Sequence, residues 1–168
     1  MPCGSHFSAM PAPRFLGRAL LDDLCAQAAA SPRLRRNHNL HATTEDPAQR
    51  FFNALQPDSY VRPHRHLAIG KEETLIVVRG RLGTLFFDDQ GNVTETRVLC
   101  PSGEDFGLFI PTGLWHSVLA LELTVFFEAK RGPYQPLTED EFASWAPAEG
   151  TGDAVGYLVT MREHFAGR

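Results

Sequence analysis

The stretch Arg62-Pro63-His64-Arg65-His66 carries two histidines one residue apart. On a β-strand, side chains two positions apart point to the same face, so His64 and His66 are expected to lie side by side. Glu73 opens the next strand-like run, and His116 follows a tight turn later in the chain. Imidazole and carboxylate groups delivered together from strands are typical ligands of transition metals. The sequence therefore predicts a site for one divalent transition metal and leaves the choice among zinc, iron, nickel and manganese open.

Short strand-like runs alternate with turn signals over much of the chain. Gly, Pro, Asp and Asn gather between the runs, and Asp89-Gln90-Gly91 has the composition of a hairpin turn. Short strands at a spacing of roughly 8–12 residues are typical of a sandwich or barrel. The sequence therefore predicts a mainly β domain, with strands at residues 50–55, 60–66, 74–79, 83–87, 93–99, 106–110, 116–120 and 123–129.

The segments before and after the predicted strands have other patterns. An apolar stripe predicts a helix over residues 15–30, and the polar residues 31–48 that follow predict a wrapping loop. Near the C-terminus, Thr138 is expected to cap a short helix over residues 139–145, whereas residues 155–165 fit either a helix or an edge strand. The predicted organisation is a disordered or tag-like tail at 1–14, a helix and loop at 15–48, a β-barrel at 49–130 and a C-terminal extension packed on the barrel at 131–168.

Composition excludes several classes of function. A formal net charge of −4 and a pI near 5.9 argue against nucleic-acid binding, which requires a basic surface. No run approaches the roughly 18 apolar residues of a membrane span. The three cysteines are widely spaced and odd in number, which suits reduced thiols. We therefore expect a cytoplasmic protein with neither a nucleic-acid nor a membrane partner.

Two motifs in this sequence resemble those of the cupin superfamily. The first consists of two histidines one residue apart, a glutamate and a glycine, and the second has the form Pro-x-Gly-x-x-His. They correspond to His64, His66, Glu73 and Gly80, and to Pro111, Gly113 and His116. The resemblance implies a jelly-roll barrel with a metal held by His64, His66, Glu73 and His116. Six residues separate His66 from Glu73, more than cupins usually have, so Glu72 is an alternative ligand, although the spacing to Gly80 favours Glu73.

The flanking sequence narrows this resemblance to the WbuC-type cupin-fold metalloproteins. It is carried by Asp46-Pro47-Ala48-Gln49-Arg50, Asn53-Ala54-Leu55-Gln56-Pro57, Phe86-Phe87-Asp88-Asp89-Gln90-Gly91 and Gly132-Pro133-Tyr134. Proteins of this type are bacterial and are often encoded beside surface-polysaccharide (O-antigen) genes. The resemblance implies a metal-dependent enzyme that acts on a small polar molecule such as a sugar or nucleotide-sugar. It leaves open isomerase or epimerase, lyase and oxygenase chemistry.

A few further residues are candidates for binding a substrate. Arg50, Asn53 and Arg62 are expected near the mouth of the barrel, where arginine suits a carboxylate or phosphate. Tyr134 is the candidate catalytic residue, as an acid–base or binding hydroxyl that returns over the opening.

The sequence is compatible with two other functions besides that of an enzyme that acts on a small-molecule substrate. One is a non-enzymatic, metal-dependent protein that binds a small ligand, and the other is an iron-dependent dioxygenase. A homodimer is compatible with the sequence, because exposed barrel edges offer a pairing surface.

Overall fold

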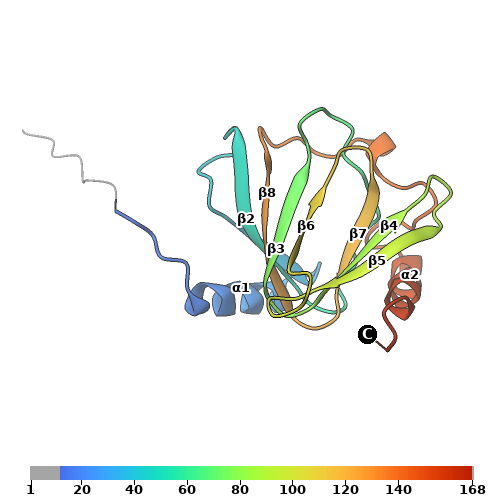
Figure 1. Ribbon diagram of the computed structural model, residues 1–168, viewed down its shortest axis with the longest axis horizontal. Helices are drawn as coiled ribbons and strands as arrows, with labels where there is room; N and C mark the ends of the chain where they lie inside the picture. The colour runs from blue at the N-terminus through green and yellow to red at the C-terminus, as the bar shows by residue number, and fades with distance from the viewer. Residues whose placement is uncertain (1–11, 168) are drawn as a thin grey trace, which may run out of the picture.

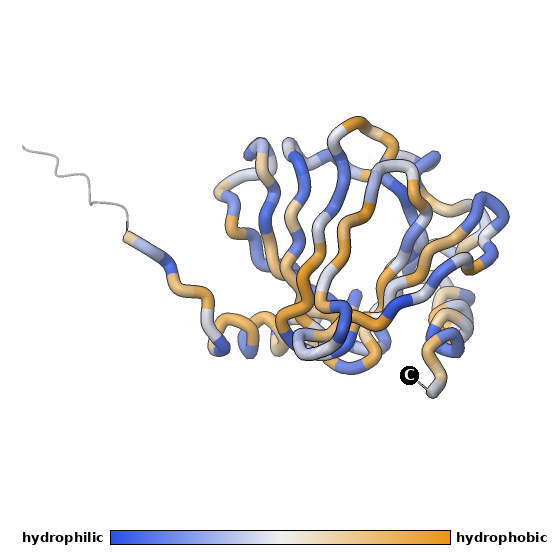
Figure 2. The backbone as a smooth tube through the Cα atoms, viewed as in Figure 1, coloured by the Kyte–Doolittle hydropathy of each residue, from blue (hydrophilic) through white to orange (hydrophobic). Residues whose placement is uncertain are grey.

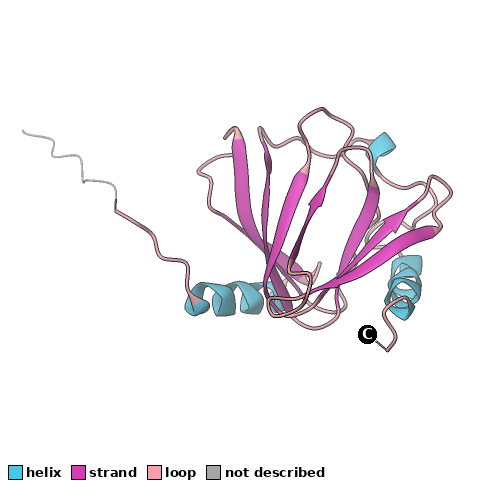
Figure 3. Ribbon diagram, in the orientation of Figure 1, coloured by secondary structure: helices cyan, strands magenta, loops and turns pink. Residues whose placement is uncertain are grey.

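The computed structural model describes residues 12–167, which form two antiparallel sheets with a helix at each end of the chain (Figures 1 and 3). In chain order the elements are α1 (Arg18–Ala30), β1 (Arg35–Asn39), β2 (Ala48–Leu55), β3 (Glu73–Arg79), β4 (Leu82–Phe87), β5 (Val93–Leu99), β6 (Gly107–Ile110), β7 (Trp115–Ala120), β8 (Thr124–Arg131), the 3₁₀ turn η1 (Glu139–Glu141) and α2 (Gly152–Glu163). The larger sheet has the strand order β1-β2-β8-β3-β6 and the smaller one β5-β4-β7. The predicted mainly β class is confirmed.

The connections between the sheets are those of a jelly roll. Residues 60–66 lie beside β7, where His64 forms an antiparallel bridge with His116, so this segment takes the place of a fourth strand in the smaller sheet. The chain passes from β2 to this segment, returns to the larger sheet at β3 and crosses to the smaller sheet at β4 and β5. It then alternates between the two sheets at β6, β7 and β8. Two antiparallel sheets connected in this way form a jelly roll. Within residues 12–167 no ladder of hydrogen bonds joins the sheets, so the barrel is not closed.

Two predictions about strands were wrong. The loop predicted over residues 31–48 contains β1, which pairs with β2 over its whole length despite its polar sequence. Its side chains need no apolar alternation because the strand lies at the edge of the sheet. Residues 60–66 were predicted as a strand, yet only His64 forms ladder-type bridges there. Pro63 lacks a backbone N–H and interrupts the pairing.

The helices also differ in part from the sequence prediction. α1 begins at Arg18 rather than at residue 15, so Phe15 precedes the helix and is 89% exposed. The helix predicted over residues 139–145 is a single 3₁₀ turn, although the predicted cap forms: the Glu141 carboxylate accepts hydrogen bonds from the Thr138 N–H and hydroxyl. Residues 155–165, for which two structures were open, fall largely within α2.

Apolar residues collect at the end of the fold where the strands converge, as the lower half of Figure 2 shows. One cluster lies between the sheets and includes Leu75, Leu82 and Phe126. α1 adds Leu24 and Cys25 to the outer face of the larger sheet, and α2 covers the smaller sheet with a second cluster. The upper ends of β2, β3 and β8 are more hydrophilic, so this end of the fold carries the polar groups (Figure 2).

Some of the predictions concern the N-terminal tail, the segment boundaries and the cysteines. Most of the tail predicted for residues 1–14, and Cys3, lie outside the described residues. The boundaries predicted for the four segments of the chain stay predictions. Cys25 and Cys100 are free thiols, and neither helix of the described chain is long and apolar enough to cross a membrane.

Gly80, the last residue of the first motif, should tolerate no side chain. Its φ of +77° is unfavourable for other residues, and a Cβ there would overlap the Leu123 carbonyl oxygen and lie 2.8 Å from Thr124. We expect Gly80→Ala to lower the free energy of unfolding by about 1–3 kcal/mol, measured by urea denaturation. Gly156→Ala is the matched control, because a Cβ in the middle of α2 meets no atom within 4 Å. An equal loss of unfolding free energy in Gly80→Ala and Gly156→Ala would contradict the requirement for glycine at position 80.

Candidate metal centre

Four side chains from three separate parts of the chain meet at the polar end of the fold. His64 and His66 come from the segment between β2 and β3, Glu73 is the first residue of β3, and His116 is the second residue of β7. Their ligand atoms all lie within 4.8 Å of one another. Glu73 and His116 are buried and the other two are half-buried. The structure therefore brings together the four residues that the sequence named, with Glu73 rather than Glu72 as the carboxylate.

Backbone hydrogen bonds fix the segment that carries the first two histidines. The His64 N–H donates to the His116 carbonyl at 3.0 Å, and the His116 N–H donates back to the His64 carbonyl at 2.9 Å. On its other side, Arg65 donates its N–H to the Glu141 carbonyl at 2.9 Å. Residues 60–66 are therefore held between β7 and the loop around η1, which explains how an irregular segment presents two imidazoles in a defined orientation.

The hydrogen bonds of the rings determine which nitrogen is free. Nδ1 of His64 lies 3.0 Å from the Arg62 carbonyl, and Nδ1 of His116 lies 2.9 Å from the Leu114 carbonyl. A carbonyl oxygen only accepts, so both Nδ1 atoms carry the proton. Burial, followed by the neighbouring His116, lowers the pKa of His64 to about 3, so its ring is neutral at ordinary pH. Its Nε2 atom therefore offers a lone pair, as a metal ligand must.

Two of the converging nitrogens have no hydrogen-bond partner. Nε2 of His66 and Nε2 of His116 are buried and unsatisfied within the described chain. Each faces Glu73, at 2.9 and 3.5 Å from its carboxylate oxygens, but without the alignment of a hydrogen bond. Buried polar atoms are rarely left without a partner, and such an orphan indicates a missing water or ion. The donor set and its unsatisfied atoms fit a divalent transition metal.

A half-buried ammonium group supports the carboxylate of the cluster. Lys130 Nζ lies 2.8 Å from Glu73 Oε1 and 2.8 Å from Glu128 Oε1, and Asn53 donates to Glu128 Oε2 at 2.7 Å. Burial alone would raise the pKa of Glu73, but its contacts with His116, His66 and Lys130 outweigh this and hold the pKa well below its usual range. Burial, and next the charge of Glu73, raises the pKa of Glu128 to about 7.

Sequence reasoning missed Glu128 and Lys130. A signal was present, because both alternate in phase with the core residue Phe126 along β8 and therefore share its inward face. Their meeting with Glu73 depends on strand register, which pairs Lys130 of β8 with Glu73 of β3.

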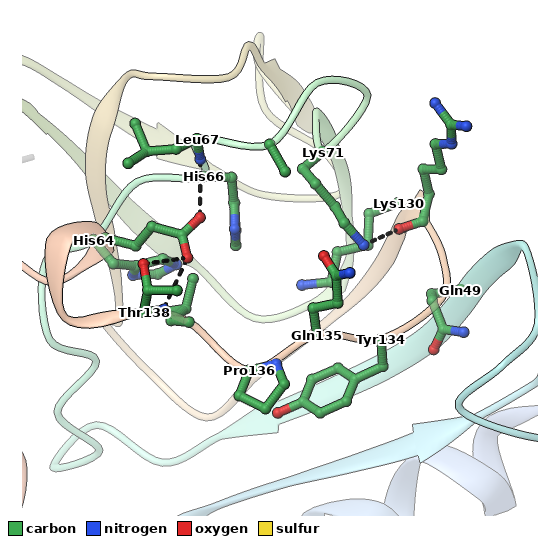
Figure 4. Close-up of a pocket in the computed structure, with 14 residues that line it drawn as sticks. Gln49, His64, His66, Leu67, Lys71, Lys130, Tyr134, Gln135, Pro136 and Thr138 are labelled. Carbon is green, nitrogen blue, oxygen red and sulfur yellow. Dashed lines mark hydrogen bonds between the residues drawn. The ribbon is translucent and has the colours of Figure 1, made fainter.

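A pocket of about 590 Å³ opens beside the cluster (Figure 4). Its lining residues are Gln49, His64, His66, Leu67, Ala68, Lys71, Lys130, Arg131, Tyr134, Gln135, Pro136, Leu137, Thr138 and Glu141. A smaller cavity of about 190 Å³ between the sheets reaches Glu73 and His116 and shares His64 and Lys130 with the pocket. The cluster therefore lies between an outer pocket and an interior cavity.

The other predicted site residues have different positions. Tyr134 lines the outer pocket and is 54% exposed, and Asn53 lines the inner cavity. Arg62 donates to the Ala143 carbonyl at 2.7 Å and lies over the Phe142 ring, so it braces the loop after η1. Arg50 is exposed and lines neither cavity. A binding role for these residues remains a prediction, and the geometry favours Tyr134 and Asn53 over the two arginines.

Comparison with known proteins gives one match by sequence and several by structure. The model of a family described as "Domain of unknown function (DUF6016)" matches residues 16–99. No curated protein is significantly similar to the chain in sequence.

The similar solved structures are distant. A conserved protein of unknown function from Streptococcus pyogenes is 12% identical, with a TM-score of 0.46, over 62% of this chain and 80% of that one. A cupin superfamily protein from Desulfitobacterium hafniense is 12% identical, with a TM-score of 0.46, over 58% of this chain and 76% of that one. KdgF from Halomonas sp. is 17% identical, with a TM-score of 0.48, over 62% of this chain and 84% of that one. At this distance no activity is transferred from them.

Proposed function

The chain belongs to the DUF6016 family, a domain of unknown function, and we propose that it is a metal-binding cupin that acts on a small polar molecule in the pocket beside the cluster. The observation that carries the proposal is the convergence of imidazole nitrogens and one carboxylate, two of the nitrogens being buried without a partner. His64, His66, Glu73 and His116 would hold one divalent transition metal. A set of four protein ligands leaves coordination positions open on a five- or six-coordinate ion, as a catalytic metal site requires.

The residues of the chain provide a preorganised site. The carbonyls of Arg62 and Leu114 orient the rings of His64 and His116, and Lys130 orients the Glu73 carboxylate. When bound, a divalent metal supplies Lewis-acid polarisation of a substrate oxygen. Tyr134 lines the same pocket and is half exposed, and in this proposal its hydroxyl would bind a polar group of the ligand or exchange a proton with it. The reaction class stays open among isomerisation or epimerisation, lyase chemistry and oxygenation.

The resemblance to WbuC-type proteins adds a finer proposal. On that ground we propose a bacterial, cytoplasmic protein whose substrate is a sugar or nucleotide-sugar intermediate of surface-polysaccharide synthesis. The pocket supports a ligand of this size, since sites for small molecules generally have volumes of about 300–1,000 Å³. A metal-dependent binding protein without catalytic activity is the alternative, and a bound ligand that is never turned over would favour it.

Metal content tests the proposal directly. Untagged protein purified without added metal is expected to contain about one equivalent of a single divalent transition metal by ICP-MS. His66→Ala and His116→Ala should each lose most of the metal, because each substitution removes one of the four ligands. His38→Ala, a histidine on β1 outside the cluster, is the matched control and should keep its metal. Full occupancy in both cluster variants would show the assignment to be wrong.

A further inference from the structure

Positive charge is concentrated around the outer pocket of a chain whose formal net charge is −4. Lys71, Lys130 and Arg131 line the pocket, and besides the cluster itself the only carboxylate among its lining residues is Glu141. Figure 4 shows Lys71 and Lys130 on one side of the pocket and His64 and His66 on the other. A ligand in this space would therefore meet the cations at one end and the cluster at the other.

The Glu141 carboxylate forms hydrogen bonds with its own and a neighbouring loop rather than an ion pair with these cations. Its Oε1 accepts the Leu67 N–H at 2.9 Å, and its Oε2 accepts the N–H and hydroxyl of Thr138 at 2.9 and 3.1 Å. The carboxylate is thus engaged in joining the loop after His66 to the turn at η1. It forms no ion pair with a lysine or arginine of the described chain.

Two of the cations have no carboxylate partner. Lys71 donates its ammonium group to the carbonyls of Arg131 and Pro133, at 3.0 and 2.6 Å, and an ammonium has a third N–H to offer. The Arg131 side chain lies against the backbone of Gly70, where a Cβ would be 2.7 Å from Nη1, and it makes no ion pair within residues 12–167. Lys130, in contrast, is neutralised by Glu73 and Glu128. Two cationic side chains without a carboxylate partner, Lys71 and Arg131, therefore lie next to each other at the rim of the pocket.

We propose that the pocket binds a small anion, whose carboxylate or phosphate group is held by Lys71 and Arg131 while the rest of the molecule faces the cluster. Arginine presents a planar fork of donors to such a group, and lysine adds a point charge. Tyr134 and Gln135, two of the neutral polar residues of the lining, are suited to hydroxyls of the same ligand. The part of this inference that concerns orientation toward the cluster rests on the proposed function.

Isothermal titration with three matched probes tests the charge requirement. Glucose, glucuronate and glucose 6-phosphate share most of a hydroxyl pattern and differ in charge, so their comparison separates an uncharged sugar, a carboxylate and a phosphate. We expect at least one anionic probe to bind about tenfold or more tightly than glucose. The preference should shrink as salt is added, because the two cations are accessible to solvent.

Variants locate the binding group. Lys71→Gln and Arg131→Gln should each weaken binding of the preferred anion by about tenfold while the metal content, measured by ICP-MS, stays unchanged. Arg36→Gln is the matched control, since Arg36 is an exposed arginine on β1 that lines neither cavity.

The outcomes separate this inference from the proposed function. If the protein holds metal but binds neither anion at millimolar concentration, or binds glucose equally well, the inference is overturned and the metal site stands. If anion affinity is unchanged in the Lys71 and Arg131 variants but lost in His66→Ala, the anion binds the metal alone and the inference is again overturned. If no metal is found, the proposed function fails, and anion binding that still depends on Lys71 and Arg131 would support the inference independently.

Discussion

Replacing Lys130 with methionine is expected to lower the free energy of unfolding of the metal-free protein by about 3–5 kcal/mol. The ammonium group lies 2.8 Å from both Glu73 and Glu128, and the side chains of these carboxylates are only 6% and 10% exposed. Without Lys130, the Glu73 carboxylate would remain buried beside Glu128 with no cation to balance it. Removal of one partner from a buried ionic group is costly because the remaining charge has lost its solvation and gains no compensation.

The measurement is denaturant unfolding in the presence of a chelator, so that metal binding makes no contribution. Lys71→Met is the matched control, since Lys71 is the only other lysine of the chain and lies at the exposed rim of the pocket. Its effect should be within about 1 kcal/mol. Adding Glu73→Gln to Lys130→Met should restore part of the loss, because the carboxylate that Lys130 leaves unbalanced is then replaced by an uncharged group. A Lys130→Met protein as stable as the parent would exclude this network as a source of stability.

The second large effect concerns pH. The metal-free protein should lose stability as the pH falls from about 6.5 to about 3, and His64 should account for up to about 4 kcal/mol of the loss. In the unfolded chain the imidazole takes up a proton near its ordinary pKa of 6.5, whereas in the folded protein burial delays protonation until about pH 3. Between these values the unfolded state binds more protons than the folded state, so acid favours unfolding.

The carboxylates determine where this loss is steepest. The pKa of Glu128 is raised from 4.5 to about 7, so its contribution to stability is present below pH 4.5 and is lost as the pH rises toward 7. That slope opposes the slope of His64 between about pH 4.5 and 6.5. The lowered pKa of Glu73 has the opposite sign, and its contribution is lost as the pH falls below its ordinary value of 4.5. The steepest loss of stability is therefore expected below about pH 4.5.

Urea unfolding at a series of pH values checks this expectation. His64→Asn should flatten the acid side of the profile, because asparagine has no proton to take up there. His38→Asn, the same substitution on the edge strand β1 outside the cluster, is the matched control. Identical profiles for His64→Asn and the parent protein would show that His64 is not held neutral in the folded state.

The sequence predicted those features of the fold that depend only on neighbouring residues, such as turns and the alternation of side chains along a strand. Turns at Gly80 and Gly91 were predictable because their backbone angles favour glycine, and φ is +77° and +86° there. Most strands were predictable because the alternation of side chains follows directly from strand geometry. β1 was missed because its pairing with β2 leaves no apolar pattern in its own residues.

By itself, the sequence determined the mainly β class, the approximate positions of most strands and the three histidines of the cluster. It left the choice between Glu72 and Glu73 open, because His66 and Glu73 are joined by a loop whose path no short-range rule defines. Only the tertiary structure decided that Glu73 enters the cluster, that Lys130 and Glu128 stand behind it, and that Lys71 and Arg131 lie together at a pocket. The physical reason is that these contacts join residues of different strands and loops, so they depend on sheet register and on the packing of one sheet against the other rather than on spacing along the chain.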